Sequence, residues 1–308
     1  MVFNVHPLSE RCGVFLTAVV LLLLGAPATV ARAQTLSDRE QELLRRAESQ
    51  HLSAADEKRW LEAFKEWAKT EPPEAFAPRS TIEKRYREHL ASGGLTPDQI
   101  DLRWGSVLRT RQDDQEWLRL AGNKSYAAGW YEGVPPSSHL AEFIDGKTPG
   151  KALDCGMGAG RNAVFLASRG WDVTGLDRSD VAIQRAEELA AKAGVRIHAV
   201  RGLYQDFEWG KDQWDLIINI GSWDNVGRPN STFSKAPLAA ALKPGGFLYI
   251  ENGTASMAWQ RAFLEKLFPG VEVVQRLIKA DPEWAPALAA AAGRDRVVFT
   301  VRKPTAGR

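Results

Sequence analysis

Residues 153–162 read Leu-Asp-Cys-Gly-Met-Gly-Ala-Gly-Arg-Asn, and this stretch decides the fold of the chain. A short apolar run precedes it and a helical pattern follows it, so the glycines are expected in a turn between a strand and a helix. Glycine has no Cβ atom, which allows a tight turn and lets the backbone approach a ligand closely. In open α/β sheets ligands bind at the carboxyl ends of the strands, where such a turn lies. The stretch therefore predicts a nucleotide-binding turn.

The spacing of the glycines separates two kinds of nucleotide ligand. A dinucleotide fingerprint has a third glycine at its sixth position, and here that position holds the bulky Arg161. The pattern is instead an acid, Asp154, followed by Gly156, Gly158 and Gly160. S-adenosylmethionine has no diphosphate but carries an ammonium group, which the carboxylate of Asp154 suits directly or through water. The spacing predicts S-adenosylmethionine as the cofactor, with a purely structural turn as the alternative.

Strand and helix patterns alternate along the second half of the chain. Strands are expected at 152–153, 172–176, 196–200, 214–220, 247–251, 271–278 and 296–301, and helices at 162–168, 179–193, 237–242 and 256–268. This alternation is typical of a parallel sheet covered on both faces. The closing two strands have no clear long helix between them, which fits an antiparallel connection. Residues 121–308 are therefore predicted to form an α/β, Rossmann-like three-layer sandwich.

A second acid, Asp177, ends the second expected strand. A carboxylate at this strand end can accept hydrogen bonds from both ribose hydroxyls. Dinucleotides and S-adenosylmethionine both carry ribose, so Asp177 favours an adenosyl ligand without separating the two. Asp177 could instead cap the next helix, a role that Ser179 or Asp180 can also fill.

The stretch ALDCGMGAGRNAVFLASRGWDVTGLDRSDVA at 152–182 resembles the opening of class I S-adenosylmethionine-dependent methyltransferases. It is similar to the branch that shares Gly-x-Gly-Arg-Asn, which includes tellurite-resistance and related small-molecule methyltransferases. Residues 214–217 and 242–248 resemble the acid of the family's fourth strand and the turn before its fifth. The resemblance covers roughly half the chain and implies a seven-stranded sheet whose last strand is antiparallel.

The resemblance also implies a set of cofactor contacts. They comprise the turn, its neighbouring polar residues and the second strand end: Asp154, Gly156, Gly158, Gly160, Arg161, Asn162, Asp177 and Arg178. Family members commonly hold the adenine amino group with an acid after the third strand, but this chain has Leu203 or Tyr204 there. Asp206 is the nearest acid and the candidate for that role, with a solvated loop carboxylate as the equal alternative. Phe207 or Tyr204 could stack on adenine, or pack in the core.

The loop after the fourth expected strand is the natural place for the methyl acceptor. Because a sulfonium is an activated methyl donor, the protein mainly needs to align the reactants and exclude water. Asn219 could orient an acceptor or contact the cofactor, Trp223 could wall the pocket, and Asp224 could accept a proton. An ordinary polar loop is at least as good an interpretation of each residue. The loop lacks the Asn-Pro-Pro-Tyr motif of nucleic-acid amino methyltransferases.

Residues 34–120 are predicted to form a helical extension, with capping boxes at 37–40 and 96–99. Tyr126, Trp130 and Tyr131 follow it and could close over the cofactor, or pack the extension on the sheet.

Residues 1–33 have the pattern of a secretory signal peptide. The apolar run 14–24 is followed by Ala31-Arg32-Ala33, a sequence that a signal peptidase accepts. This predicts an exported protein, periplasmic or secreted, although S-adenosylmethionine is made in the cytoplasm. An uncleaved membrane anchor, or a cytoplasmic protein with a misassigned start, is the alternative.

Charge and composition exclude several other classes. Forty basic residues against 38 acidic ones leave a net charge of +2, so neither nucleic acid nor an anionic membrane is an expected partner. The five histidines are scattered, and no metal site is predicted. The favoured function is methyl transfer to a small-molecule acceptor. The alternatives are a non-catalytic adenosyl-binding module and, disfavoured by Arg161, a dinucleotide-dependent oxidoreductase.

Overall fold

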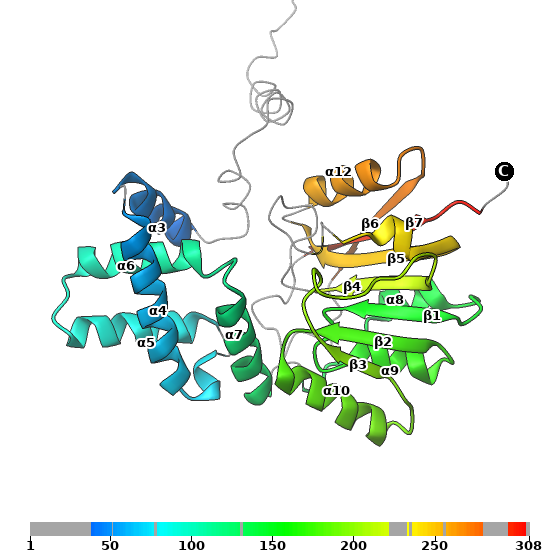
Figure 1. The fold of residues 1–308 in the computed structure, drawn as a ribbon, viewed down its shortest axis with the longest axis horizontal. Helices are drawn as coiled ribbons and strands as arrows, with labels where there is room; N and C mark the ends of the chain where they lie inside the picture. The colour runs from blue at the N-terminus through cyan, green and yellow to red at the C-terminus, as the bar shows by residue number, and fades with distance from the viewer. Residues whose placement is uncertain are drawn as a thin grey trace, which may run out of the picture.

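The computed structural model describes residues 38–50, 52–76, 79–129, 132–221, 233, 236–254, 257–279 and 295–305. Within them, a group of helices near the N-terminus is followed by an α/β body (Figure 1). Several predictions fall outside the described residues: the signal peptide at 1–33, and the side chains of Trp130, Tyr131, Trp223 and Asp224.

The described residues of the α/β body form one seven-stranded sheet. Its strands are β1 (Lys151–Cys155), β2 (Asp172–Asp177), β3 (His198–Arg201), β4 (Trp214–Ile220), β5 (Leu242–Gly253), β6 (Val273–Lys279) and β7 (Asp295–Arg302). They lie in the order β3-β2-β1-β4-β5-β7-β6. The first five strands pair in parallel, and β7 lies antiparallel between β5 and β6. The predicted sheet, with an antiparallel last strand, is therefore confirmed.

Helices cover both faces of the sheet (Figure 1). They are α8 (Ser138–Ile144), α9 (Arg161–Ser168), α10 (Asp180–Lys192), α11 (Leu238–Ala241) and α12 (Met257–Leu267). Successive strand residues point to opposite faces, so Leu216 and Ile218 join one apolar core with α8, α9 and α10. Ile217 joins the other core with α11 and α12. Two cores on either side of one sheet make the predicted three-layer sandwich.

Strand β5 is longer than the expected strand at 247–251, because it already begins directly after α11. Its register with β4 shifts between Trp214 and Leu216, so Pro244-Gly245-Gly246 bulge from the ladder. A Cβ atom on Gly246 would lie 2.9 Å from the carbonyl oxygen of Trp214. The expected turn is therefore a bulge inside the strand, and glycine permits its close backbone contact.

The N-terminal helices have an apolar core of their own. They are α3 (Asp38–Ser49), α4 (Ala54–Thr70), the 3-10 helix η2 (Pro73–Phe76), α5 (Arg79–Ser92), α6 (Pro97–Thr110) and α7 (Gln115–Ala127). Phe64, Tyr86 and Trp104 are fully buried in this core and lie in mutual ring contact. The capping box predicted at Thr96 and Gln99 is confirmed, since each side chain bonds the other residue's backbone.

Helix α7 joins the helical extension to the α/β body. It continues through residue 120, where the sequence places the domain boundary, and it contacts both η2 and α10. Ser179 Oγ, at the start of α10, donates to Asn123 Oδ1 of α7 at 2.7 Å. None of the helices in the described part of the chain is long and apolar enough to cross a membrane.

Candidate functional site

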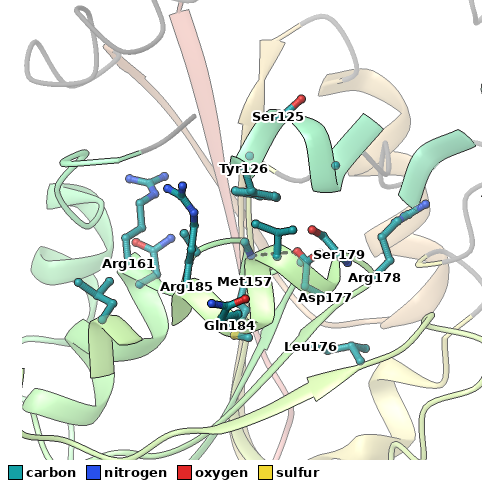
Figure 2. Close-up of a pocket in the computed structure, with 18 of the residues that line it drawn as sticks. Ser125, Tyr126, Met157, Arg161, Leu176, Asp177, Arg178, Ser179, Gln184 and Arg185 are labelled. Atoms are coloured by element: carbon teal, nitrogen blue, oxygen red, sulfur yellow. Dashed lines mark hydrogen bonds between the residues drawn. The ribbon is translucent and has the colours of Figure 1, made fainter. Parts of the chain in front are cut away.

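A cavity of about 820 Å³ lies at the carboxyl ends of β1, β2 and β4. The strand order reverses at this point, because β1 lies between β2 and β4. Residues of the glycine turn, the end of β2, the start of α10 and the segments after β3 and β4 form its wall, and helix α7 also contributes to it (Figure 2). Pockets for small ligands span about 300–1,000 Å³, so this cavity can hold a nucleoside and a second small molecule.

The glycines of the turn have two different structural roles, one in the cavity wall and one in helix packing. Gly156 and Gly158 line the cavity, and Gly158 has a left-handed φ of 57°. A Cβ atom on Gly158 would lie 2.5 Å from the hydroxyl oxygen of Tyr126, which reaches down from α7. Gly160 does not line the cavity; a Cβ atom there would lie 2.7 Å from the Cβ of Ala186. Gly160 thus permits the close packing of α9 on α10, and its contact with the cofactor stays a prediction.

Asp177 lies in the cavity wall with its carboxylate held by backbone amides. The N–H of Gly158 donates to Oδ2 and the N–H of Ser179 donates to Oδ1, each at 2.9 Å. Burial raises the pKa of Asp177, and these two amides oppose that rise. Each carboxylate oxygen can accept a further bond. The carboxylate is therefore fixed in place and still able to bind hydroxyl donors such as those of a ribose.

Asp154 lies directly behind the turn and is 1% exposed, so it does not itself line the cavity. Among the described residues its Oδ2 atom has no hydrogen-bond partner. Burial, offset in part by Arg161, raises the pKa of this carboxyl group to about 7. A buried carboxyl oxygen without a partner is costly. A cationic ligand group at the turn would relieve that cost, which fits the ammonium group of S-adenosylmethionine.

The raised pKa of Asp154 predicts a pH-dependent stability. Because the folded-state pKa lies above the unfolded value, this group stabilises the fold below about pH 4 and loses that contribution as the pH rises to about 7. A shift of this size corresponds to about 4 kcal/mol. Asp154→Asn should remove the dependence, measured by urea unfolding from pH 4.5 to 8. Equal pH slopes for the parent and the variant would contradict this assignment.

Arg161 and Asn162 line the cavity but direct polar atoms to the segment before α8. Arg161 donates from Nη1 to the carbonyl oxygen of Pro135 at 2.6 Å. Asn162 Oδ1 accepts the N–H of Ser137 at 3.0 Å. Gly133 and Val134, just before these residues, also line the cavity. The Gly-Arg-Asn sequence therefore fixes a neighbouring wall segment as well as starting α9.

A buried ionic network extends from this segment. Glu251 Oε2 accepts hydrogen bonds from Ser137 Oγ at 2.6 Å and from Tyr249 Oη at 3.1 Å. Arg296 Nε donates to Glu251 Oε1 at 3.0 Å. Burial and the charge of Glu251 raise the pKa of Tyr249. Arg296 also lies beside Gly221 in the cavity wall, 3.7 Å from where its Cβ would be. The network joins β5 and β7 to the segment before α8 and to Gly221 in the cavity wall.

The structure places three expected cofactor residues away from the cavity. Asp206 is exposed in the loop after β3 and does not line the cavity. Phe207 packs on Trp209 and Trp214 in the sheet core. Asn219 is fully buried, and its Nδ2 donates to the carbonyl oxygen of Cys155 at 3.0 Å, so it joins β4 to β1. In this structure the Asp206 side chain is therefore exposed to solvent, while those of Phe207 and Asn219 pack in the core.

The cavity is lined by further residues, of which sequence reasoning predicted Arg178, left Tyr204 and Tyr126 open and passed over Ser125. Tyr204, the alternative to Phe207, does line the cavity. Arg178 also lines it, and its Nη1 donates to Gln115 Oε1 of α7 at 3.1 Å. Ser125 and Tyr126 form a roof from α7 (Figure 2). Ser125 had no sequence signal, whereas the sequence singled out Tyr204 as an aromatic residue for adenine, Arg178 as a cofactor contact and Tyr126 as an aromatic residue close to the α/β body.

Comparison with known proteins agrees with this geometry. Residues 152–246 match the family model described as a methyltransferase domain. The chain carries a class I S-adenosylmethionine-dependent methyltransferase domain. The match covers the glycine turn, Asp177 and the first four strands. The Gly-x-Gly-Arg-Asn branch suggested by the resemblance is not distinguished by this match.

Two curated relatives show how far the likeness extends. The chain is similar to the ribosomal RNA small subunit methyltransferase C of Alcanivorax borkumensis, 30% identical over 170 residues, covering 52% of this chain and 50% of the relative. It is also similar to the ubiquinone biosynthesis O-methyltransferase of Pasteurella multocida, 27% identical over 152 residues, covering 46% of this chain and 60% of the relative. The chain thus spans about half the length of the curated relatives it matches.

Among solved structures, phosphoethanolamine N-methyltransferase 2 of Haemonchus contortus, in complex with S-adenosyl-L-methionine, covers 64% of this chain and 60% of its own. The identity is 16% and the TM-score is 0.46. In the described part of the methyltransferase domain and extension, no cluster of three or more His, Cys, Asp or Glu side chains could hold a metal ion.

Proposed function

We propose that this protein transfers the methyl group of S-adenosylmethionine to a small-molecule acceptor. One observation carries the proposal: the amide-fixed carboxylate of Asp177 and the glycine turn at Gly156 and Gly158 line the same cavity. That arrangement suits a ribose and an amino-acid chain better than a diphosphate. The helix after the turn begins at Arg161, where a dinucleotide-binding turn has its third glycine.

Different residues of the chain would bind different groups of S-adenosylmethionine. Asp177 would hold the ribose hydroxyls, and Tyr204 offers an aromatic surface beside them. Asp154 would balance the ammonium group from behind the turn. When bound, S-adenosylmethionine supplies an activated methyl group, so the protein needs to align an acceptor and keep water out. The roof formed by α7 serves that exclusion.

A small acceptor is favoured over nucleic acid. The names of the relatives include both ribosomal RNA and ubiquinone biosynthesis, so they do not choose between the two classes. The net charge of +2 is too low for strong phosphate-backbone binding. The cavity is also roofed by a helix that an extended nucleic acid would have to displace.

The test uses the full chain, methyl-labelled S-adenosylmethionine and a panel of small thiols, alcohols, amines and carboxylates. We expect binding in the micromolar range, of order −8 kcal/mol, and release of S-adenosylhomocysteine with at least one acceptor. Binding without transfer to any member of the panel would instead support a non-catalytic adenosyl-binding module. Preferential binding of a nicotinamide dinucleotide would support the oxidoreductase.

A further inference from the structure

The amino-acid end of S-adenosylmethionine has two charges, and the site described above accounts for only one of them. Asp154 suits the ammonium group, but the carboxylate needs a cationic partner. Among the residues that the structure describes, four cationic side chains line the cavity: Arg161, Arg178, Arg185 and Lys192. Their positions and existing bonds decide which of them is available near the turn.

Two of the four are badly placed for this role. Arg178 extends away from the turn toward α7 (Figure 2), where it bonds Gln115 at 3.1 Å. Lys192 is the last residue of α10. At 1.5 Å per residue it lies about 20 Å along the helix from Ser179. Neither can reach a group held at Gly156 and Gly158 while Asp177 binds the ribose.

Arg161 and Arg185 remain, and they differ in how strongly the protein holds them. Both side chains rise on the side of Tyr126 away from Arg178 (Figure 2). Arg161 Nη1 is committed to Pro135 by a short bond of 2.6 Å. Arg185 makes two long contacts, each 3.4 Å, one to Glu132 Oε2 and one to the carbonyl oxygen of Ala127.

The contacts of Arg185 are weak enough to be exchanged. Good N–H···O bonds are about 2.9–3.0 Å long, and the Glu132 side chain is 74% exposed. Ion pairs of this kind contribute little to stability. A ligand carboxylate bound in the cavity would offer the same charge as Glu132 with less exposure to water. A guanidinium group can hold such a carboxylate through two parallel bonds.

We propose that Arg185 binds the carboxylate of S-adenosylmethionine, replacing its contact with Glu132. The inference rests on the proposed function, because it presumes an adenosyl ligand in this cavity. It makes Arg185 a specificity residue, which separates amino-acid-bearing adenosyl ligands from those without a carboxylate.

The test compares S-adenosylmethionine with its decarboxylated form, which differs only in lacking that carboxylate, by calorimetric titration of the full chain. We expect Arg185→Gln to weaken S-adenosylmethionine binding about tenfold or more, and to leave binding of the decarboxylated form within about twofold. Lys192→Gln is the matched control, because it removes the same charge from the same cavity. It should preserve the parent's preference for the carboxylate-bearing ligand.

Each outcome either supports or overturns the role of Arg185. Equal losses for both ligands in Arg185→Gln, or no loss for S-adenosylmethionine, would overturn the role of Arg185 while leaving the adenosyl site intact. Failure of the parent to bind either ligand would overturn the proposed function and this inference together.

Discussion

Replacing Asp177 with asparagine is expected to weaken binding of S-adenosylhomocysteine by about a hundredfold or more. Hydrogen bonds to a charged group contribute about 1.5–3 kcal/mol each, and a ribose offers two. The carboxylate already accepts the amides of Gly158 and Ser179 on separate oxygens. An asparagine turns one of those oxygens into an N–H₂ donor facing an N–H donor. The variant therefore loses a ribose acceptor and distorts the turn.

Asp180→Asn is the matched control for Asp177→Asn. It removes the same charge three residues later, from an exposed side chain that does not line the cavity. Its affinity for S-adenosylhomocysteine should match that of the parent, measured by calorimetry at one pH and salt concentration. If the two variants bound the ligand equally well, Asp177 would not be the ribose-binding acid.

Arg296→Met is expected to lower the free energy of unfolding by about 3–5 kcal/mol, the cost of leaving one member of a buried ion pair alone. The Glu251 side chain is 1% exposed and that of Arg296 13%. Without Arg296, the hydrogen bonds that the described residues still donate to the carboxylate come from the hydroxyls of Ser137 and Tyr249. Urea unfolding of the full chain measures the change.

Arg276→Met gives the comparison for this pair. Arg276 lies on the neighbouring strand β6 and pairs with Glu142 at 3.1 Å, but both side chains are more than half exposed. Its loss should cost about 1 kcal/mol or less. Adding Glu251→Gln to Arg296→Met should restore part of the stability, because it removes the uncompensated charge. Equal costs for Arg296→Met and Arg276→Met would contradict the importance of the buried pair.

Local sequence patterns predicted the parts of the fold that depend on near neighbours. The glycine turn, the position of Asp177 at a strand end and the capping box at Thr96 all follow from residues within a few positions of one another. The alternation of strands and helices predicted a parallel sheet, because two parallel neighbouring strands need a crossover connection, which is usually a helix. The residues Pro244-Gly245-Gly246 predict a turn, but they form a bulge in β5, because glycine is common in turns and in bulges alike.

Contacts between distant residues could not be predicted in this way. Ser137 and Glu251 are 114 positions apart, and no local pattern marks them as partners. Every residue of β4 from Leu216 to Ile220 is buried, so its apolar run did not show that Asn219 faces the core. Arg185 is an ordinary helix residue until the end of α7 is placed beside it.

A crystal structure of the full chain with S-adenosylhomocysteine tests the central claim most directly. The account predicts the nucleoside in the cavity between the glycine turn and α7, both ribose hydroxyls on the Asp177 carboxylate and the amino-acid end above Gly156. A structure with the ligand elsewhere, with side chains filling the cavity, or with a dinucleotide's diphosphate on the turn, would contradict it.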